Sequence, residues 1–106
     1  MPKILIIEDE ETIRRVLKKV LHQEDKNYEI IEAVDGVDGV SKINSNKFDL
    51  ILCDIKMPKK DGIEVLRHVL KECPNTPTIM ISGHGDLETA VESMRIGAFD
   101  YISKPP

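Results

Sequence analysis

The chain has 106 residues, of which 41% are hydrophobic and 32% are charged, as is typical of a single globular domain. Fifteen basic and 19 acidic residues give a formal net charge of -4. This balance argues against direct nucleic-acid contact by the domain, because such contact needs a basic face. The first apolar run, residues 4–7, is far too short to cross a membrane. Cys53 and Cys73 match no disulfide or metal-binding spacing, so we expect reduced thiols in a cytoplasmic protein without membrane contact.

Short apolar runs alternate with helical patterns from one end of the chain to the other. Residues 4–7 and 50–53 are continuous apolar runs, as expected of parallel strands covered on both faces. Asp35-Gly36 is expected to break the second strand. In chain order the pattern predicts strands at 4–7, 28–34, 50–53, 79–81 and 101–102, and helices at 13–21, 37–43, 63–70 and 87–94.

Strands that alternate with helices predict an α/β fold, with a parallel sheet between two helical layers. The chain reaches Pro106 directly after the fifth strand, so we expect one domain, 1–106, that lacks a fifth helix. A single helix, 13–21, would then cover its side of the sheet. One apolar face of strands 4–7 and 50–53 should be partly bare, so this piece should be less stable than a longer chain or form a homodimer.

The chemistry is expected at the carboxyl ends of the strands, where open parallel sheets bind ligands. Four acidic residues, Glu8 to Glu11, follow the first strand, where a nucleotide-binding domain would place glycines. Clustered carboxylates repel an anion but suit a hard cation such as Mg²⁺. Asp54 ends the third strand and Lys104 follows the fifth. We therefore expect the carboxylates of Glu8, Asp9 and Asp54 to converge with Lys104 at this edge of the sheet.

These residues, in this order, resemble the receiver domains of bacterial two-component response regulators, the CheY-like family. The resemblance covers the whole chain and rests on five segments, which are Glu8-Asp9, Asp54 to Gly62, Ser82-Gly83, Gly97 to Ile102 and Lys104-Pro105. It implies a flavodoxin-like, doubly wound, five-stranded parallel sheet in the order 2-1-3-4-5. The stretch from Ser82 to Pro105 is most similar to receivers of sigma-54-dependent transcriptional activators.

The resemblance also implies a role for each matching residue. Asp54 would be the phospho-acceptor, and Asp9, Asp54 and the backbone carbonyl of Lys56 would ligate Mg²⁺. Glu8 would act on the ion through a water. Lys104 and Ser82 would each contact a phosphoryl oxygen, and Tyr101 would turn inward when Ser82 moves.

The implied function is a phospho-acceptor switch. Asp54 would take a phosphoryl group from a sensor histidine kinase, and the domain would control a DNA-binding or ATPase output domain of a longer chain, in transcription. Beyond its own phosphorylation and dephosphorylation it would not be an enzyme. Two alternative functions fit the sequence less well. A Mg²⁺-dependent phosphohydrolase would need a second carboxylate shortly after Asp54, where Lys56 and Met57 stand. A flavodoxin-like cofactor module would need a glycine-rich or hydroxyl-rich loop after the first strand.

Two further expectations concern the edge of this site. Lys56 and His84 each lie two residues beyond a site residue, so their side chains should stand at its mouth and tune the lifetime of the phosphoryl group. The Lys104-Pro105 peptide should be cis, as the resemblance implies, so that the lysine can point back into the site.

Overall fold

The computed structural model of the protein describes residues 1–104. Strands and helices alternate along them, as the sequence predicts. The elements are β1 (Lys3–Ile7), α1 (Glu11–Glu24), β2 (Glu29–Ala33), α2 (Gly36–Ser45), β3 (Leu50–Asp54), α3 (Gly62–Glu72), β4 (Thr78–Ser82), α4 (Leu87–Ile96) and β5 (Asp100–Ser103). The predicted cis peptide between Lys104 and Pro105 falls outside the described residues.

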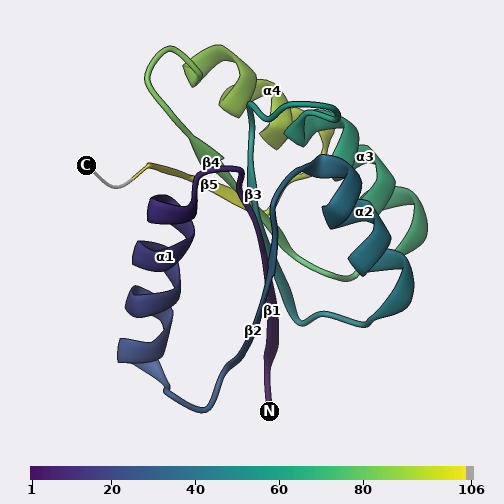
Figure 1. The fold of residues 1–106 in the computed structure, drawn as a ribbon. Coiled ribbons are helices and arrows are strands. Elements are labelled where there is room, and N and C mark those ends of the chain that lie inside the picture. The colour runs from purple at the N-terminus through teal and green to yellow at the C-terminus, as the bar shows by residue number, and fades with distance from the viewer. Residues whose placement is uncertain (105–106) are drawn as a thin grey trace.

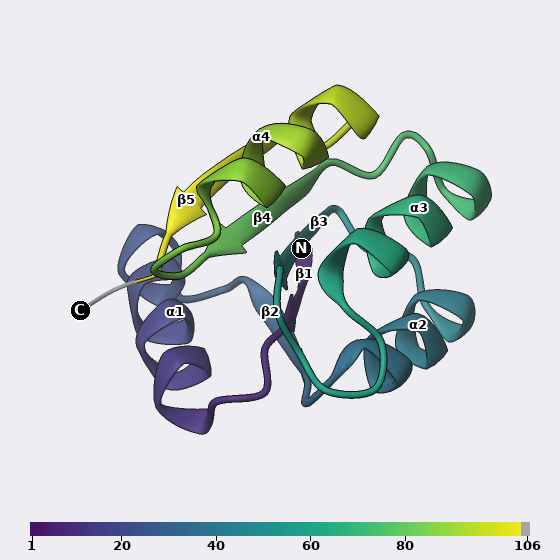
Figure 2. The same cartoon turned by 90° about the horizontal axis from the view of Figure 1, so that it is seen from above.

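The five strands form one parallel sheet in the order β2-β1-β3-β4-β5, which confirms the predicted topology. Figures 1 and 2 show α1 alone on one side of the sheet and α2, α3 and α4 on the other. In register, Ile7 of β1 lies beside Cys53 of β3, and Asp54 lies beside Ile81 of β4. The ends of β1, β3 and β4 therefore meet at one edge of the sheet.

Both faces of the central strands are buried, which explains their continuous apolar sequences. Alternate residues enter two separate cores. Leu5, Ile51 and Met80 pack under α2, α3 and α4, whereas Ile6, Leu52 and Ile81 pack with Leu17 of α1. These core residues are at most 7% exposed, so the strands that carry the site are held from both sides.

Local sequence fixes the start of two helices. Asp35 and Asp61 each accept a hydrogen bond from a backbone N–H three residues later, as N-cap residues do. Asp35-Gly36 therefore ends β2 by starting α2. Gly62 begins α3 pressed against Asp54, because a Cβ at this position would collide with the Asp54 backbone carbonyl. The loop after Asp54 closes tightly only with glycine there.

The bare apolar face was predicted on the wrong strands. Ile4 and Ile6 of β1 and Leu52 of β3 are at most 4% exposed, because α1 lies directly over β1 and β3. Incomplete cover on this side occurs further along the sheet, where Ile79 of β4 is half-buried and Ile102 of β5 is 39% exposed. Four helices occur in residues 1–104, and none follows β5 there.

No helix among the described residues is both long enough and apolar enough to cross a membrane.

Candidate functional site

The carboxyl edge of the sheet gathers the acidic residues that the sequence singled out. Asp54 ends β3 and Glu8 follows β1, and both are 0% exposed. Lys104 reaches them from the end of β5. Its Nζ atom lies 3.2 Å from Asp54 Oδ2, 3.4 Å from Glu8 Oε1 and 3.3 Å from Glu10 Oε1. Of the residues expected to converge here, the structure brings Glu8, Asp54 and Lys104 into contact.

Three buried carboxylate oxygens of this site lack a hydrogen-bond partner among residues 1–104. Both side-chain oxygens of Asp54 and Oε1 of Glu8 are buried without one, although Lys104 stands within ion-pair distance. Burial therefore dominates their ionisation. It raises the pKa of Glu8 to about 7, aided by the neighbouring Asp9 and Asp54, and it also raises the pKa of Asp54. A second cation would relieve the excess negative charge.

Lys104 carries the one positive charge that touches these two buried carboxylates in residues 1–104. Burial by itself would lower the pKa of Lys104, but the negative charges of Asp54 and Glu8 outweigh it, so the pKa is raised. The ammonium group therefore stays protonated throughout the neutral range. A fixed positive charge at this place can neutralise part of an added anionic group.

The acidic residues fit a hard divalent cation. One carboxylate oxygen from each of Glu8, Asp9 and Glu10 lies within 4.8 Å of the others. Asp9 is exposed, and its negative charge contributes to the raised pKa of Asp54, but Asp54 is not part of this trio. Carboxylate oxygens without hydrogen-bond partners are the ligands that Mg²⁺ prefers. This donor set is consistent with the predicted magnesium site.

Ser82 and Tyr101 lie beside the acidic residues on neighbouring strands. The Ser82 hydroxyl donates a hydrogen bond to the backbone carbonyl of Ile102, at 3.2 Å. Tyr101 pairs with Met80 of β4 and packs, half-buried, against the core under α4. The Ser82 hydroxyl thus has a β5 partner in this structure, and contact with a phosphoryl oxygen stays a prediction for it, as does inward movement for Tyr101.

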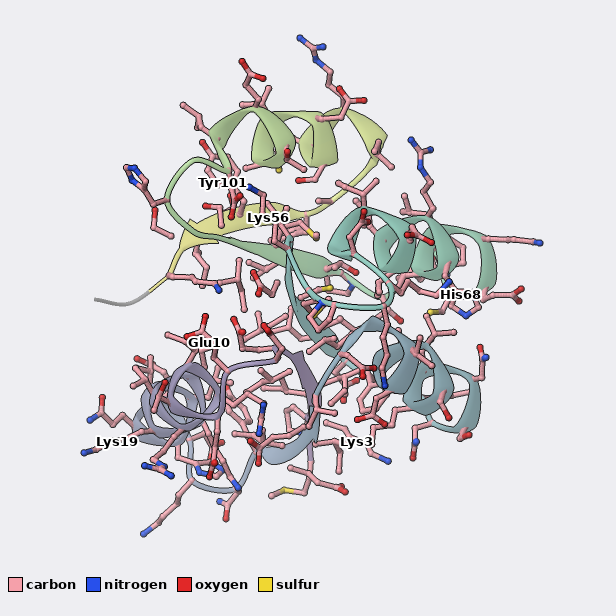
Figure 3. The ribbon with its side chains drawn as sticks, turned by 45° about the horizontal axis from the view of Figure 1, so that its top comes forward. Lys3, Glu10, Lys19, Lys56, His68 and Tyr101 are labelled. Atoms are coloured by element: carbon pink, nitrogen blue, oxygen red, sulfur yellow. The ribbon has the colours of Figure 1, made fainter. Side chains whose placement is uncertain are left out.

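Lys56 and His84 were predicted at the mouth of the site. Both are exposed, and His84 lines a hollow of about 220 Å³ together with Ser82, Gly83, Ser103 and Lys104. Figure 3 shows Lys56 reaching from the β3–α3 loop towards α4. There its Nζ atom lies 3.1 Å from Asp86 Oδ1. Their effect on the phosphoryl group stays a prediction.

The sequence interpretation gave no role to two residues that the structure places around this site. Glu10 pairs with Lys104, and its own position in the acidic run is the signal that could have found it. Asp86 is 3% exposed, pairs with Lys56 and accepts a hydrogen bond of 2.7 Å from the Gly83 N–H. Asp86 occupies the N-cap position of α4, but its side chain makes no capping hydrogen bond to that helix.

Cys53 lies next to Asp54 inside the sheet. Its thiol is 0% exposed and contacts the Asp54 backbone carbonyl at 3.4 Å. Burial, together with the nearby carboxylates, raises the pKa of this thiol far above its ordinary value. Cys73, beyond α3, is half-buried. Both cysteines are free thiols, as predicted.

Comparison with known proteins agrees with the fold. Residues 4–106 match the family model of the response regulator receiver domain. The transcriptional regulatory protein ResD of Bacillus subtilis is 43% identical over 97% of this chain and 42% of its own length. ZraR of Klebsiella oxytoca is 33% identical over 96% of this chain and 23% of its own, which agrees with the resemblance to sigma-54-dependent activators. The chain thus spans less than half the length of these curated relatives.

Solved structures give the same result. A response regulator receiver domain protein from Clostridium thermocellum superposes with a TM-score of 0.88 at 37% identity, over 100% of this chain and 84% of that one. Neither alternative, the phosphohydrolase or the cofactor module, is favoured by these matches. The family match, the sheet order and the acidic edge agree, and the chain belongs to the response regulator receiver domains.

Proposed function

We propose that the domain is a phospho-acceptor switch in which Asp54 takes a phosphoryl group from a sensor histidine kinase. The observation that carries this proposal is the state of the Asp54 carboxylate. It is 0% exposed at the end of a strand, both of its oxygens lack a hydrogen-bond partner among the described residues 1–104, and Lys104 Nζ lies 3.2 Å away. A buried carboxylate kept in this way is costly to the fold, so a reactive role is the simplest reason for it.

In the proposed step a carboxylate oxygen of Asp54 forms a bond to phosphorus. The bond between phosphorus and the nitrogen of the kinase histidine breaks, and that nitrogen keeps the electron pair. The product on this chain is an acyl phosphate. Lys104 neutralises part of the charge on the phosphoryl oxygens, since its ammonium group already lies beside Asp54.

A divalent cation, when bound, supplies the remaining positive charge. Asp9, Asp54 and the backbone carbonyl of Lys56 would hold it directly, and Glu8 would act through a water. The close approach of the Glu8 and Asp9 carboxylate oxygens supports the part of this assignment that concerns these two residues. Its ligands are all oxygens, which favours Mg²⁺ over softer metals.

Phosphorylation would then move the β4–α4 loop. For Ser82 to donate to a phosphoryl oxygen, its hydroxyl must leave the Ile102 carbonyl that it now contacts. The loop contains Gly83 and Gly85, and Gly85 has a φ of 84°, which glycine adopts readily. Tyr101 would turn inward as Ser82 moves, so that the surface of α4 and β5 changes. In a longer chain this surface would control an output domain that acts in transcription.

Intact-mass analysis after incubation with Mg²⁺ and acetyl phosphate tests the proposal. We expect a single acyl phosphate on the wild-type chain, none on Asp54→Asn and none in excess EDTA. Asp49→Asn is the matched control, because Asp49 is an exposed aspartate next to the opposite end of the same strand, and it should be labelled like the wild type. Undiminished labelling of Asp54→Asn would refute the proposal.

A further inference from the structure

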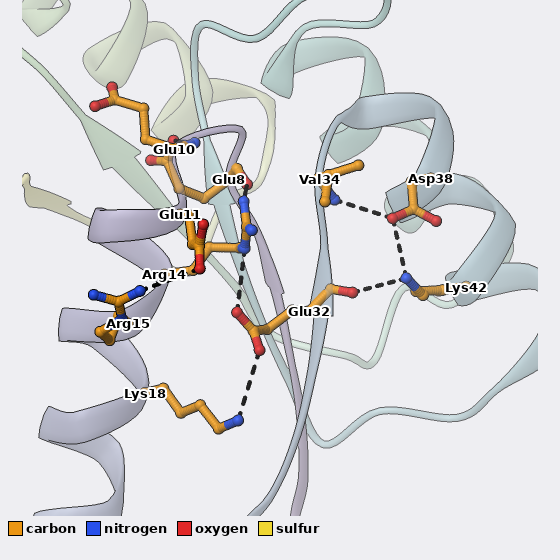
Figure 4. A network of polar contacts seen from close by, with 10 residues as sticks. All are labelled: Glu8, Glu10, Glu11, Arg14, Arg15, Lys18, Glu32, Val34, Asp38 and Lys42. Carbon is orange, nitrogen blue, oxygen red and sulfur yellow. Dashed lines mark hydrogen bonds and ion pairs between the residues drawn. The ribbon is translucent and has the colours of Figure 1, made fainter.

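A polar network joins α1 to β2 behind the acidic residues (Figure 4). At its centre is Arg14, whose side chain is only 13% exposed. The Arg14 Nε group donates to Glu32 Oε1 at 3.2 Å, and Lys18 Nζ lies 3.6 Å from the other oxygen of Glu32. Most of the Arg14 side chain is therefore covered by the rest of the molecule.

The same guanidinium reaches the turn that carries Asp9. Arg14 Nη1 donates to the backbone carbonyl of Glu8 at 2.8 Å, and the Arg14 backbone N–H donates to the carbonyl of Glu10 at 3.1 Å. The Glu10 N–H in turn donates to Glu8 Oε2 at 3.0 Å. The Arg14 side chain therefore holds the residue before Asp9, whereas its bond to Glu10 is an ordinary backbone bond at the start of α1, and the Asp9 side chain itself stays exposed.

The charge of Arg14 is compensated away from the acidic site. Glu32 pairs with the Nε side of the guanidinium, whereas the Nη1 side meets a neutral carbonyl. An uncompensated arginine behind a cation site would weaken the binding of the cation. Glu32 thus fixes the guanidinium and also balances its charge, and the planar fork of arginine serves both contacts at once, which an ammonium group cannot do equally well.

We propose that Arg14 is a positioning residue of the acidic site, anchored by Glu32, that holds the Glu8–Asp9 turn ready for a divalent cation. The inference rests on the proposed function, since it takes this turn as the cation site. Arg14 acts through the backbone and has no contact with the cation or with the phosphoryl group. Groups that orient metal ligands from behind commonly change metal affinity by about tenfold to a hundredfold.

Titration with Mg²⁺, followed by the backbone amide signals of residues 8–10 in NMR spectra, tests the proposal. We expect Arg14→Ala to weaken Mg²⁺ binding about tenfold. Arg15→Ala is the matched control, because Arg15 is the adjacent arginine, is 71% exposed and, within the part of the chain that the structure describes, pairs only with Glu11. It should bind Mg²⁺ within about twofold of the wild type, a change of about 0.4 kcal/mol.

Two further measurements separate positioning from general destabilisation. In EDTA, the Glu10 amide signal should shift in Arg14→Ala and stay in place in Arg15→Ala, since Arg14 holds the turn even without metal. Arg14→Lys keeps the charge and much of the packing, and it should recover only part of the Mg²⁺ affinity. A lower melting temperature of Arg14→Ala with wild-type Mg²⁺ affinity would overturn the inference. Failure of the wild-type chain to bind Mg²⁺ would instead overturn the proposed function, and this inference with it.

Discussion

The acidic site and the network of Arg14 and Glu32 meet at Glu8, and they differ in how their charged groups are compensated. In the acidic site, the carboxylates of Glu8 and Asp54 are fully buried and three of their oxygens lack hydrogen-bond partners. In the network behind it, each oxygen of Glu32 faces a cation, and the side chain is 35% exposed. The first arrangement costs folding free energy, whereas the second stabilises the joint between α1 and β2. Buried carboxylate oxygens without hydrogen-bond partners therefore distinguish the acidic site from the network that supports it.

The largest expected effect is the pH dependence of the metal-free protein. The pKa of Glu8 is raised by burial to about 7 in the folded state, against an ordinary value of 4.5, so the folded chain holds a proton that the unfolded chain has lost between these values. Stability should therefore fall as the pH rises from about 5 to 7, by about 2 kcal/mol, and level off above that. Urea unfolding in EDTA at several pH values measures it.

Glu8→Gln provides the control for this pH dependence, because an amide cannot titrate. Its stability should change much less over the same range. Glu32→Gln should keep the wild-type dependence, since Glu32 lies outside the buried pair. Equal slopes in the wild type and Glu8→Gln would contradict the assignment.

The next effect concerns Asp54→Asn in the absence of metal. Because burial raises the pKa of Asp54, its charged form opposes folding, and a neutral side chain of the same shape removes that penalty. The amide can donate to Glu8, and Lys104 keeps Glu8 and Glu10 as partners. We expect a gain of about 1–2 kcal/mol, or roughly 5–10 °C in Tm, by thermal melting in EDTA. Glu32→Gln should lose stability in the same assay. An Asp54→Asn protein that melts below the wild type would contradict the view that the buried Asp54 charge opposes folding.

A smaller effect is expected on the lifetime of the acyl phosphate. Lys56 and His84 are both exposed, and we predict that they lie at the mouth of the site, where attacking water must enter. Replacing both by Ala should change the dephosphorylation rate by more than about twofold, or about 0.4 kcal/mol in barrier. Loss of label followed by intact mass measures this rate. Lys18→Ala, in the supporting network, should leave the dephosphorylation rate unchanged. If the Lys56→Ala, His84→Ala double variant also leaves the rate unchanged, these two residues do not tune the lifetime of the phosphoryl group.

The smallest expected effect is on stability in the supporting network itself. Lys18→Ala removes a pair of 3.6 Å between half-exposed side chains, while Arg14 continues to hold Glu32. The loss should be at most a few tenths of a kcal/mol and should shrink further in high salt. Urea unfolding at two salt concentrations checks it. A loss above about 1 kcal/mol would show that this network is more tightly coupled than its exposure indicates.

The main lines of the fold could be predicted because few local rules decide them. The apolar runs 4–7 and 50–53 can be strands only if both faces are covered, and alternation with helices then implies a parallel sheet. That topology places Glu8, Asp54 and Lys104 at one edge without any knowledge of side-chain conformation. The approximate positions of all nine elements were predicted in this way, with bounds within a few residues.

Contacts that depend on how elements pack could not be predicted. The periodicity of α1 gives its buried face, but it does not say that the helix lies over β1 and β3 and leaves Ile102 exposed. It also cannot show that Arg14, on the polar side of α1, reaches the Glu8 carbonyl. Asp86 occupies a typical cap position, yet its carboxylate turns back to the Gly83 N–H and to Lys56.

The two thiols, Cys53 and Cys73, differ in accessibility, so their alkylation rates can report how often the sheet opens. Cys53 is fully buried and its raised pKa keeps it protonated, so iodoacetamide has no access to a thiolate there while β3 remains in place. Cys73 is half-buried and can react from the folded state. Alkylation of this chain should therefore proceed in two steps. The slower rate would report how often the strand that carries Asp54 leaves the sheet, on the same timescale as exchange of its backbone amides.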